Sequence, residues 1–359
     1  MLTSAIDASQ ATVGHVYIVV LNWNGWRDTI ECLESVLRLD YPKYRVVVCD
    51  NASSDGSMDQ IRRWARGEIK AEARNPALAA LTSPPVPKPI QFAELPPAGT
   101  RTDCAARLLL IQTRANLGFA GGNNVALRYA LKRGDWDFAW LLNNDTVVRH
   151  DALSHLVHRM RERPEAGICG STLLYYDDHS KVQAWGGSVY NKWFARGGHI
   201  GKLADAGHLP EAEEVERKMA YVVGASMLVR RSFLEQVGLM DERYFSTFEE
   251  IDWATRAKGK FGLAYAPDSI VYHREGAATG AHRAASRRSA LTEFYTSRNR
   301  VLFTRTYHPL ALPSVLAAVG LSAAHRLVNL RWQNLKALIL GVIQSFKAWE
   351  RTSPDNHLH

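Results

Sequence analysis

Two apolar, β-branched runs near the N-terminus, separated by a segment with helical spacing, constrain the fold more than any other feature of this sequence. Residues 16–21 read Val-Tyr-Ile-Val-Val-Leu, and residues 45–49 read Arg-Val-Val-Val-Cys. Between them, apolar side chains recur at helical intervals over residues 30–37, behind a capping-box pattern at residues 28–31. Apolar strands that alternate with helices are typical of a parallel sheet buried between helical layers. The pattern therefore predicts an α/β fold with a mostly parallel sheet flanked by helices.

The alternation continues to about residue 280 and divides the chain into three parts. We expect an N-terminal tail over residues 1–14, an α/β domain over residues 15–280, and a basic linker with a helical C-terminal region over residues 281–359. Residues 66–105 are rich in Ala and Pro and predict an irregular surface insertion. Further strands are expected at residues 108–112, 138–142, 263–266 and 269–272, with a helix at about residues 125–132.

The charge balance and the cysteines narrow the class of protein. The chain has 44 Lys and Arg residues against 36 Asp and Glu residues, a net charge of +8, which suits a nucleotide, a lipid phosphate, an acidic membrane surface or a nucleic acid. No Cys-x-x-Cys pair occurs, which favours buried free thiols in the reducing cytoplasm over disulfides or zinc. The four cysteines are Cys32, Cys49, Cys104 and Cys169.

The sequence predicts no membrane-spanning segment. Residues 1–14 lack the basic start and apolar core of a signal peptide. The longest apolar region, residues 310–324, is interrupted by Pro313 and is shorter than the ~20 residues that cross a bilayer. We therefore expect a cytoplasmic protein.

Four predicted strands end in polar residues. In open α/β sheets, ligands bind beyond the carboxyl ends of the strands. One such ending is ordinary turn chemistry, because Asn, Asp and Gly dominate turns, but four together indicate a shared site. The residues are Asn22 and Asn24, then Asp50, Asn51 and Asp55, then Asn116 and Gly118, and finally Asn143, Asn144 and Asp145.

Two of these strand ends suggest particular contacts. Asp50 could accept hydrogen bonds from a base N–H or a ribose hydroxyl. Residues 116–124 form a Gly-rich loop ahead of a predicted helix, where backbone N–H groups could meet a phosphate or a sugar. This loop does not have the Gly-x-Gly-x-x-Gly pattern, so it is also compatible with a simple helix entry that has an Asn cap.

Asp145 predicts a divalent cation. A hard divalent cation can bridge a carboxylate at a strand tip to two phosphates, because Mg²⁺ takes one or two carboxylates together with substrate oxygens. His273 ends the predicted strand at residues 269–272 and could complete such a shell. Taken by itself, a lone His is more often a structural residue.

A cluster of acids among aromatic residues predicts a general base. Residues 245–253 read Phe-Ser-Thr-Phe-Glu-Glu-Ile-Asp-Trp and place Glu249, Glu250 and Asp252 within four positions. Carboxylates held among apolar groups have a raised proton affinity, which suits a base that works near neutral pH.

At this point the sequence resembles family 2 glycosyltransferases of the GT-A fold, in particular the bacterial rhamnosyltransferase-type branch. The resemblance covers about residues 16–300 and rests on seven motifs in the family's order. They are the 16–25 opening, Val-Val-Cys-Asp-Asn-Ala-Ser-Ser-Asp-Gly at 47–56, Asn-Leu-Gly-Phe-Ala-Gly-Gly-Asn-Asn at 116–124, Leu-Asn-Asn-Asp-Thr at 142–146, Gly-Ala-Ser-Met-Leu-Val at 224–229, Val-Gly-Leu-Met-Asp-Glu at 237–242 and Phe-Glu-Glu-Ile-Asp-Trp at 248–253. Phe-Tyr-Thr-Ser-Arg-Asn-Arg at 294–300 follows them.

The resemblance implies roles for individual residues. Residues 15–280 become the GT-A catalytic domain, with Mg²⁺ or Mn²⁺ as cofactor. Asn143 to Asp145 occupy the place of the DxD metal motif. His273 matches a histidine that joins the metal shell in some relatives, so the resemblance favours a metal-ligand role for His273 over a structural one. The nucleotide and donor residues are Asn22, Asn24, Asp50, Asn51, Asp55, Asn116, Gly118, Gly121, Asn123, Asn143 and Asn144, and the acceptor region contains Gly224, Ala225 and Trp253.

The acidic pair Glu249–Glu250 occupies the position of the family's catalytic acids, whose second member is the usual base. This sequence departs from the family twice. Asn143 replaces the first acid of the DxD motif, and Glu250 stands where Asp is commoner, so the choice of base between Glu249 and Glu250 stays open.

The resemblance implies an inverting transferase that moves a sugar from a nucleotide-diphosphate sugar to a hydroxyl group. The expected donor is dTDP-rhamnose, followed by UDP-sugars. The expected acceptor is a glycan or a polyprenyl-diphosphate-linked glycan of a cell-surface polysaccharide such as O-antigen.

The basic and apolar tail predicts either an anionic membrane surface as a further partner, with a peripheral location on the cytoplasmic membrane, or a helical cap on the catalytic domain. The sequence predicts no particular oligomeric state.

Two other functions compete with this one. A sugar nucleotidyltransferase would carry a Gly- and Arg-rich loop with a Lys after its first strand, whereas residues 22–26 read Asn-Trp-Asn-Gly-Trp. A non-catalytic nucleotide or nucleic-acid binding module would give no reason for the acids at 249–252. The basic residues also lack the interleaved aromatic pattern of a single-strand binder, so no nucleic-acid partner is expected.

Overall fold

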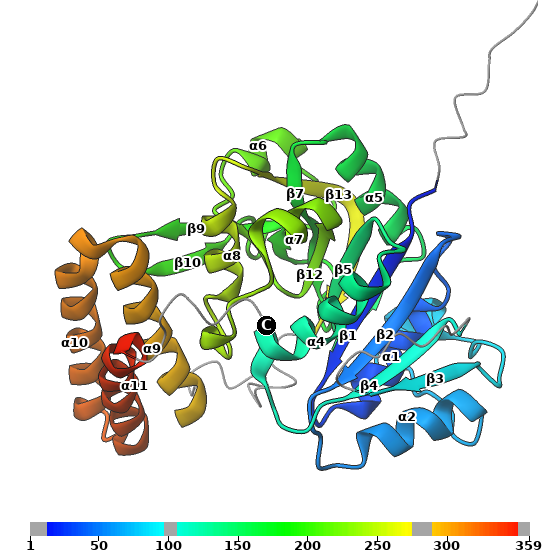
Figure 1. Cartoon of the computed structure of the whole chain (residues 1–359), viewed down its shortest axis with the longest axis horizontal. Coiled ribbons are helices and arrows are strands. Elements are labelled where there is room, and N and C mark those ends of the chain that lie inside the picture. Colours follow the sequence, from blue (N-terminus) through cyan, green and yellow to red (C-terminus); the bar gives the residue numbers. More distant parts are fainter. Residues whose placement is uncertain (1–12, 97–105, 275–288, 351–359) are drawn as a thin grey trace, which may run out of the picture.

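The computed structural model describes residues 13–96, 106–274 and 289–350, and a ten-stranded sheet forms its centre (Figure 1). The strand order is β3-β4-β2-β1-β5-β12-β7-β13-β6, with β8 paired to β7. The strands are β1 (Val16–Asn22), β2 (Tyr44–Asp50), β3 (Phe92–Leu95), β4 (Leu108–Gln112), β5 (Phe138–Asn143), β6 (Thr146–Val148), β7 (Ala166–Tyr175), β8 (Val182–Trp185), β12 (Ser226–Arg230) and β13 (Gly262–His273). The predicted mostly parallel α/β architecture is confirmed, and the expected strands at 263–266 and 269–272 are one irregular strand.

The register of the parallel strands brings their polar ends to one edge. Asn22 of β1 pairs with Asp50 of β2, and Leu21 pairs with Asn143 of β5. On β4, Gln112 lies opposite Asp50. The antiparallel strand β12 joins the other side of β5, so the segment that precedes it reaches the same edge.

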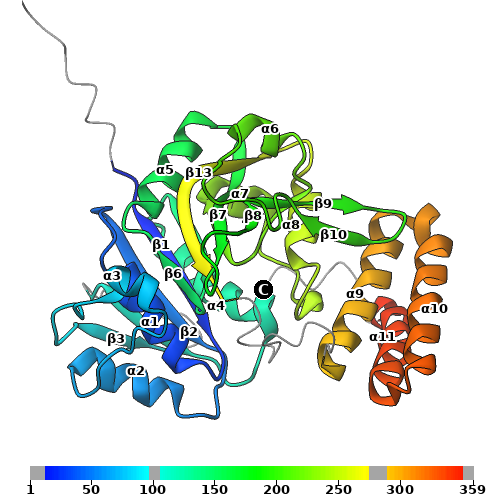
Figure 2. The ribbon, with the colours of Figure 1, turned by 180° about the vertical axis from the view of Figure 1, so that it is seen from behind.

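Helices cover both faces of the sheet and form two separate cores. One face packs against α1 (Trp26–Val36), α2 (Ser57–Arg66) and α5 (Ala152–Glu162), and the other against α4 (Gly118–Arg133), α7 (Arg231–Val237) and α8 (Glu249–Ala257). Figure 2 shows α1, α3 and α5 on the face opposite to α4. Buried Cys32, Cys49 and Cys169 are free thiols, as expected, whereas Cys104 lies outside the described residues.

Two predicted helix starts are wrong. The segment 116–124 is not a loop, because α4 begins at Gly118, where the side chain of Asn51 bonds the backbone at Leu117 and Gly118. The capping box at 28–31 does not form, because α1 begins at Trp26. The two acids of that box instead make long-range ion pairs: Asp28 pairs with Arg74 and Arg274, and Glu31 pairs with Arg74 and accepts a hydrogen bond from Tyr176.

The predicted irregular insertion at 66–105 is partly ordered. It contains a 3-10 turn (Pro76–Leu78) and the short helix α3 (Ala79–Thr82), and β3 extends the sheet parallel to β4. The buried carboxylate of Glu34 holds this segment by accepting bonds from Val86 N and Lys88 Nζ. Residues 97–105 lie outside the described part.

A small second sheet and three C-terminal helices complete the molecule. The sheet contains β9 (Gly187–Asn191), β10 (Arg196–His199) and β11 (Tyr221–Val222), and the short helix α6 (Ala212–Glu216) lies between β10 and β11 along the chain. The helices α9 (Ala290–Tyr307), α10 (Leu312–Val328) and α11 (Trp332–Glu350) stand at the end of the molecule toward which β9 and β10 extend (Figures 1 and 2). Leu302 and Phe303 of α9 pack against Ile251 of α8.

Pro313 does not interrupt the apolar C-terminal region, contrary to expectation. It lies in the first turn of α10, where proline is tolerated because its missing N–H would have no helical partner. Within the described ranges, Pro309–Val328 is one helix that is long and apolar enough to cross a membrane by length and composition, with a mean hydropathy of 1.4. A core helix of a soluble protein can meet the same criterion, but only 17% of this window is buried.

Candidate active site at the strand ends

A buried polar network ties together the ends of β1, β2 and β5. Asn22 donates to Asp50 Oδ1 at 2.9 Å and accepts from Thr29 Oγ1 at 2.8 Å. Asn144 lies 3.3 Å from Asn22 Oδ1 and 3.0 Å from Thr29 Oγ1. The other oxygen of Asp50 accepts from Ser53 N, and the side chain is fully buried. Asp50 therefore holds the loop that follows β2 and does not present a free carboxylate.

The loop above this network exposes the remaining polar groups of the first two strand ends. Asn24 is exposed, adopts a left-handed φ of 51°, and accepts from Ser54 N at 2.8 Å. Asp55 is also exposed and accepts a bond from Ser57 N at 3.0 Å, beside the start of α2. These two side chains are available to a ligand that covers the edge of the sheet.

The Gly-rich start of α4 is fixed from two sides. Asn51 donates to Asn116 Oδ1 at 2.9 Å and to Gly118 O at 3.0 Å, which connects the end of β2 to the helix. Gly118 has a φ of 72° and lies against Phe245, so no larger side chain fits there. Gly121 sits close to Leu117, and buried Asn123 bonds Phe119 O within the helix. The predicted donor loop is thus a rigid helix entry next to the acidic segment.

Asp145 and His273 face one another at the end of β5 and β13. Asp145 Oδ1 lies 3.2 Å from His273 Nε2, and Asn143 Nδ2 lies 3.3 Å from the same nitrogen. The other ring nitrogen, Nδ1, lies 2.8 Å from the amide oxygen of buried Gln183. An amide oxygen only accepts, so Nδ1 carries a proton, and in the neutral ring Nε2 then directs its lone pair toward Asp145.

This arrangement fits a divalent cation with an incomplete protein shell. With a neutral His273 ring, an acceptor nitrogen and a carboxylate oxygen face each other, and a cation between them would be bound by both. No group of three or more His, Cys, Asp or Glu residues that could hold a metal occurs in the part of the chain that the structure describes. The remaining positions would fall to oxygens of a bound substrate, as is common for Mg²⁺.

The acidic pair opens α8 on a strained backbone. Thr247 and Phe248 have left-handed φ values of 69° and 74°. Asn299 of α9 is fully buried and donates to Ser246 O at 2.8 Å and to Thr247 O at 2.9 Å. Such backbone persists only where surrounding contacts impose it. Asn299 therefore fixes the turn from which Glu249 and Glu250 project.

Glu249 and Glu250 differ in their access to solvent. Glu249 is buried, and its Oε2 has no hydrogen-bond partner among the described residues. Burial and the adjacent Glu250 raise the pKa of Glu249 well above the ordinary carboxyl range. Glu250 is half-buried, and burial also raises its pKa, although N–H groups of Glu250 and Gly224 partly offset this. Burial therefore raises the proton affinity of both carboxyl groups, and Glu250 is the more exposed of the two.

A short backbone connection joins the acidic pair to the Asp145 region. Glu250 contacts Gly224, and the next residue, Ala225, accepts a hydrogen bond from Asn143 N at 3.0 Å. Asn143 in turn reaches His273, which faces Asp145. The two acidic sites therefore lie along one edge of the sheet, joined through Gly224 and Ala225.

Two of the predicted site residues lie elsewhere. Asp252 is fully buried, and its two oxygens accept from Arg256 at 2.8 Å and Tyr307 at 2.7 Å. Trp253 is also fully buried, packs against Phe233 and donates to Gly238 O. Asp252 connects α8 to α9, and Trp253 fills the core, so neither can meet a substrate.

The sequence reasoning missed several residues that shape the site. Thr29 belongs to the buried network, Gln183 sets the tautomer of His273, and Asn299 holds the turn before α8. Arg274 donates its backbone N–H to Asp145 O and pairs with Asp28. Two of these residues could have been noticed in the sequence. Gln183 is a polar residue within the strand at 182–185, and Asn299 lies inside the family motif at 294–300.

Comparisons with known families and proteins agree with this geometry. The model of the family "Glycosyltransferase like family 2" matches residues 99–292, and the model of "Glycosyl transferase family 2" matches residues 17–80. The chain is 30% identical over 207 residues to the N-acetylglucosaminyl-diphospho-decaprenol L-rhamnosyltransferase of Mycobacterium tuberculosis. That match covers 50% of this chain and 64% of the relative, so the chain spans less than two thirds of the length of these curated relatives.

More distant similarities extend to a hexosyltransferase and to solved structures. The low-salt glycan biosynthesis hexosyltransferase Agl10 of Haloferax volcanii is 24% identical over 148 residues, which cover 41% of this chain and 45% of Agl10. The mannosyltransferase PcManGT of Pyrobaculum calidifontis, solved with GDP-Man and Mn²⁺, superposes with a TM-score of 0.50 at 16% identity, covering 95% of this chain and 89% of PcManGT. GalNAc-T7, solved with UDP, GalNAc and Mn²⁺, gives a TM-score of 0.50 at 12% identity, covering 73% and 44%. These two likenesses concern the fold.

Proposed function

This chain belongs to glycosyltransferase family 2, and from that premise we propose that it transfers a sugar, with inversion, from a nucleotide-diphosphate sugar to a hydroxyl of a lipid-linked glycan. The donor lies across the carboxyl ends of β1, β2 and β5. Its nucleoside meets the exposed groups Asn24 and Asp55, which the buried Asn22–Asp50 network supports. We propose dTDP-rhamnose as the donor, because the most similar curated relatives reported above are rhamnosyltransferases.

The proposed metal site consists of Asp145 and His273. Mg²⁺ or Mn²⁺ at this place would stabilise the negative charge that develops on the departing diphosphate. Gln183 keeps the His273 proton on Nδ1 and leaves Nε2 free to coordinate. Asn143, in the place of the first acid of the usual motif, lies near His273 Nε2 and contributes a neutral amide.

Glu250 is the proposed base. Its carboxylate takes the proton of the acceptor hydroxyl while that oxygen attacks the anomeric carbon, and the bond from this carbon to the diphosphate oxygen breaks. A single base and a direct displacement invert the configuration at the anomeric carbon. The raised pKa of Glu250 brings its proton affinity closer to neutrality, where a general base is most effective.

A polyprenyl-diphosphate-linked acceptor fits the outer face of the C-terminal helices. The relatives reported above act, by name, on N-acetylglucosaminyl-diphospho-decaprenol, a lipid-linked sugar. Leu321 and Val328 of α10 are 74% and 80% exposed, and Trp332 of α11 is 58% exposed. We propose that this face rests on the cytoplasmic side of the membrane, where such lipids reside, and that the enzyme serves cell-surface polysaccharide synthesis.

The observation that carries this proposal is the hydrogen bond from Asn143 N to Ala225 O, because it joins the Asp145 region to the base. The test is a transfer assay with radiolabelled dTDP-rhamnose, UDP-glucose, UDP-N-acetylglucosamine and GDP-mannose, each with N-acetylglucosaminyl-diphospho-farnesol and Mn²⁺ or Mg²⁺. We expect a rhamnosylated lipid from dTDP-rhamnose. Transfer from another donor would contradict the sugar assignment, and no transfer from any donor would contradict the acceptor class.

A further inference from the structure

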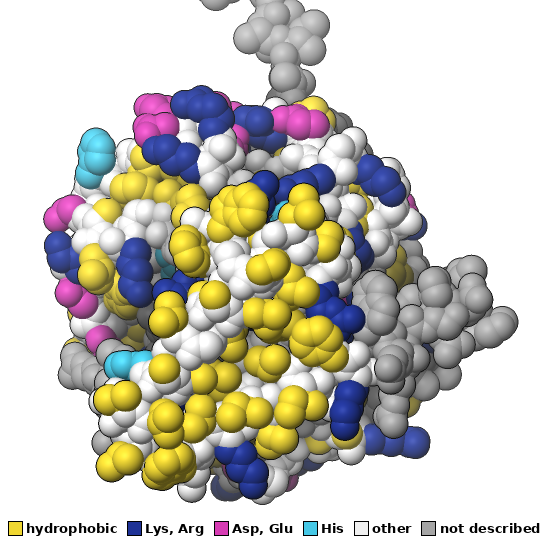
Figure 3. All heavy atoms as spheres, turned by 90° about the vertical axis from the view of Figure 1, so that its left-hand side faces the viewer, with side chains coloured by type: hydrophobic (Ala, Val, Ile, Leu, Met, Phe, Trp, Pro, Cys, Tyr) yellow, Lys and Arg dark blue, Asp and Glu magenta, His cyan; other side chains and the backbone are white. Residues whose placement is uncertain are grey.

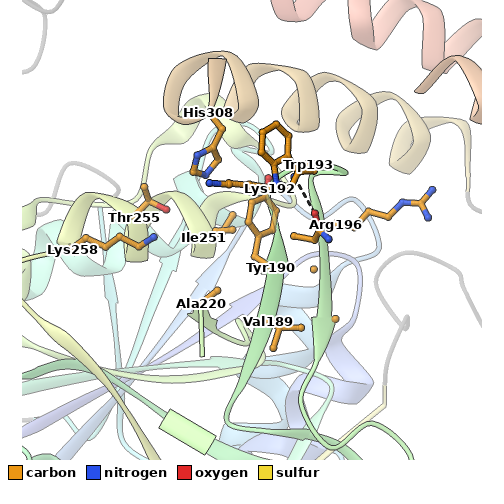
Figure 4. Close-up of a pocket in the computed structure, with 13 residues that line it drawn as sticks. Val189, Tyr190, Lys192, Trp193, Arg196, Ala220, Ile251, Thr255, Lys258 and His308 are labelled. Atoms are coloured by element: carbon orange, nitrogen blue, oxygen red, sulfur yellow. Dashed lines mark hydrogen bonds between the residues drawn. The ribbon is translucent and has the colours of Figure 1, made fainter. Parts of the chain in front are cut away.

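A hollow next to α8, the helix that carries Glu250, has no role in the proposed chemistry. It has a volume of about 620 Å³ and lies between the β9–β10 hairpin, residue 220 and the outer side of α8 (Figure 4). Ile251 and Thr255 of α8 form one wall, and Tyr190 and Trp193 of the hairpin form another. His308, which follows α9, closes the top in this view.

The hollow is cationic. Lys192, Arg196, Lys258 and His308 line it, and none of its lining residues is acidic. Among the ion pairs of the described residues, none involves Lys192, Arg196 or Lys258, whereas Arg256 of the same helix α8 is paired with Asp252. Lys192 and Lys258 therefore bring two uncompensated positive charges to one hollow, which favours an anion there.

The side chains converge rather than spread. In Figure 4 the ammonium groups of Lys192 and Lys258 and the ring of His308 point into the same space, near the hydroxyl of Thr255. The guanidinium of Arg196 points away from them. Burial lowers the pKa of His308, and the charges of Lys258 and Lys192 lower it further, which places both lysines within electrostatic reach of the ring. Two ammonium groups and an imidazole around a hydroxyl suit a phosphate or diphosphate.

Exposed apolar side chains border this cationic hollow. Trp193 and Phe194 at the tip of the hairpin are 50% and 51% exposed, and Leu310, two residues after His308, is 88% exposed. Ser314 of α10 donates to Trp193 O at 2.7 Å, which fastens the hairpin to the C-terminal helices. Figure 3 shows apolar side chains gathered over this end of the molecule, with Lys and Arg side chains among and around them. A ligand that fits both features combines a phosphate with a long apolar chain.

The hollow lies beside the base without being part of the donor site. Ile251 lines the hollow, and the preceding residue, Glu250, contacts Gly224 at the strand edge. Successive helical residues point about 100° apart, so α8 presents Glu250 to the strand edge and Ile251 to the hollow. A molecule whose sugar hydroxyl reaches Glu250 would extend its phosphate around α8 into the hollow, apart from the donor diphosphate near Asp145.

We propose that this hollow binds the diphosphate of the lipid-linked acceptor through Lys192, Lys258 and His308, while the prenyl chain runs over Trp193, Phe194 and the start of α10. The inference rests on the proposed function, which it deepens by placing the acceptor. The donor diphosphate has its own place at Asp145 and His273. Charges that surround a hollow suit a diphosphate that enters it better than lipid headgroups that meet a flat surface.

The test is the double variant Lys192→Gln/Lys258→Gln, measured with two acceptors in detergent. N-Acetylglucosaminyl-diphospho-farnesol carries the diphosphate, and octyl N-acetylglucosaminide does not. We expect the KM for the diphosphate acceptor to rise at least about tenfold, since two charge-assisted contacts are lost, with kcat and the donor KM unchanged. The KM for the octyl glycoside should stay within about twofold. Equal changes for both acceptors, or no change for the first, would overturn the proposal.

The matched control is Arg196→Gln, which removes a positive charge from the same hairpin but not from the converging group, and it should leave both KM values unchanged. A direct binding measurement separates this proposal from the proposed function. Calorimetric titration of metal-free protein with N-acetylglucosaminyl-diphospho-farnesol should show at least about tenfold weaker binding in the double variant, even if no sugar is transferred. Undiminished binding would overturn the site.

A third measurement separates the acceptor from membrane headgroups. The double variant and the unmodified protein are sedimented with phosphatidylglycerol vesicles and with phosphatidylcholine vesicles. We expect equal vesicle binding by both proteins. If the double variant loses binding to phosphatidylglycerol vesicles while its acceptor KM stays unchanged, the hollow binds lipid headgroups and the proposal is wrong.

Discussion

The carboxylate of Glu250 lies directly against the backbone of Gly224. A Cβ at position 224 would stand 2.6 Å from Glu250 Oε1 and 3.3 Å from Phe119 Cζ. The Gly224 N–H also donates toward this carboxylate. The absence of a side chain at one strand edge therefore determines where the proposed base points. This contact links the Glu249–Glu250 pair to the chain segment that bonds Asn143.

Gly224→Ala is expected to lower kcat about tenfold or more, because the added methyl must push the Glu250 carboxylate out of position. Donor binding should change little, since Gly224 does not contribute to the Asn22–Asp50 network. The measurement is steady-state kinetics with a thermal melt of each variant. Gly320→Ala is the control, because nothing lies near a Cβ at that position, and it should leave kcat unchanged. Full activity of Gly224→Ala would show that Glu250 need not occupy this place.

Glu250→Gln should reduce kcat by about 10²–10⁴-fold, the usual contribution of a general base, while the donor Kd stays within about threefold. Glu249→Gln should reduce kcat much less, because burial raises the pKa of Glu249 and favours its neutral form, whose shape an amide nearly matches. Single-turnover transfer and donor titration of both variants provide the comparison. A larger loss of kcat in Glu249→Gln than in Glu250→Gln would show that Glu249, and not Glu250, is the base.

The pH dependence of kcat/KM should report the raised pKa of Glu250. The base must be ionised to accept a proton, and burial favours its neutral form. Activity should therefore be lost as the pH falls through this raised pKa, at a higher pH than for an exposed glutamate. Nearby Tyr221 stays neutral over this range, because burial and the two glutamates raise its pKa to about 12. An acid limb at the position of an ordinary exposed glutamate would contradict the assignment.

Gln183→Leu should weaken Mn²⁺ binding about 10–100-fold, as is typical when the group that orients a ligating His is removed. Without the amide oxygen, His273 can rotate or carry its proton on Nε2, which then no longer coordinates. Electron paramagnetic resonance of Mn²⁺ with dTDP present measures this directly. His273→Ala is the reference for complete loss of the nitrogen ligand. Unchanged Mn²⁺ affinity in both variants would remove His273 from the metal shell.

Asn299→Ala should lower kcat about tenfold with little change in the donor KM, because Asn299 holds the Ser246 and Thr247 carbonyls before the acidic pair. We expect the acid limb of the pH profile to shift as well, since Glu250 would no longer be held in its present surroundings. Tyr307→Phe is the matched control on the same helix, and it removes a bond to Asp252 instead. It should lower the Tm without moving the acid limb. Equal behaviour of the two variants would reduce Asn299 to a purely structural role.

The sequence by itself determined the sheet and the edge at which the site forms. The runs at 16–21 and 46–49 are apolar, and such strands are stable only when both faces are buried between helices. Because parallel strands share one direction, the polar residues after them meet at one edge, as Asn22 and Asp50 do. Local periodicity carries this information, so it can be read without coordinates.

The tertiary structure decided how the individual side chains are used. Glu249, Glu250 and Asp252 look alike in the sequence. In the structure Glu250 lies against Gly224 and Glu249 is buried, whereas Asp252 pairs with Arg256 and accepts a hydrogen bond from Tyr307. The start of α4 at Gly118 depends on Asn51, and the tautomer of His273 depends on Gln183. These partners are distant in the sequence, and only chain packing brings them within hydrogen-bond distance. Helix starts, proton affinities and free carboxylates follow from such contacts, which leave no periodic signal in the sequence.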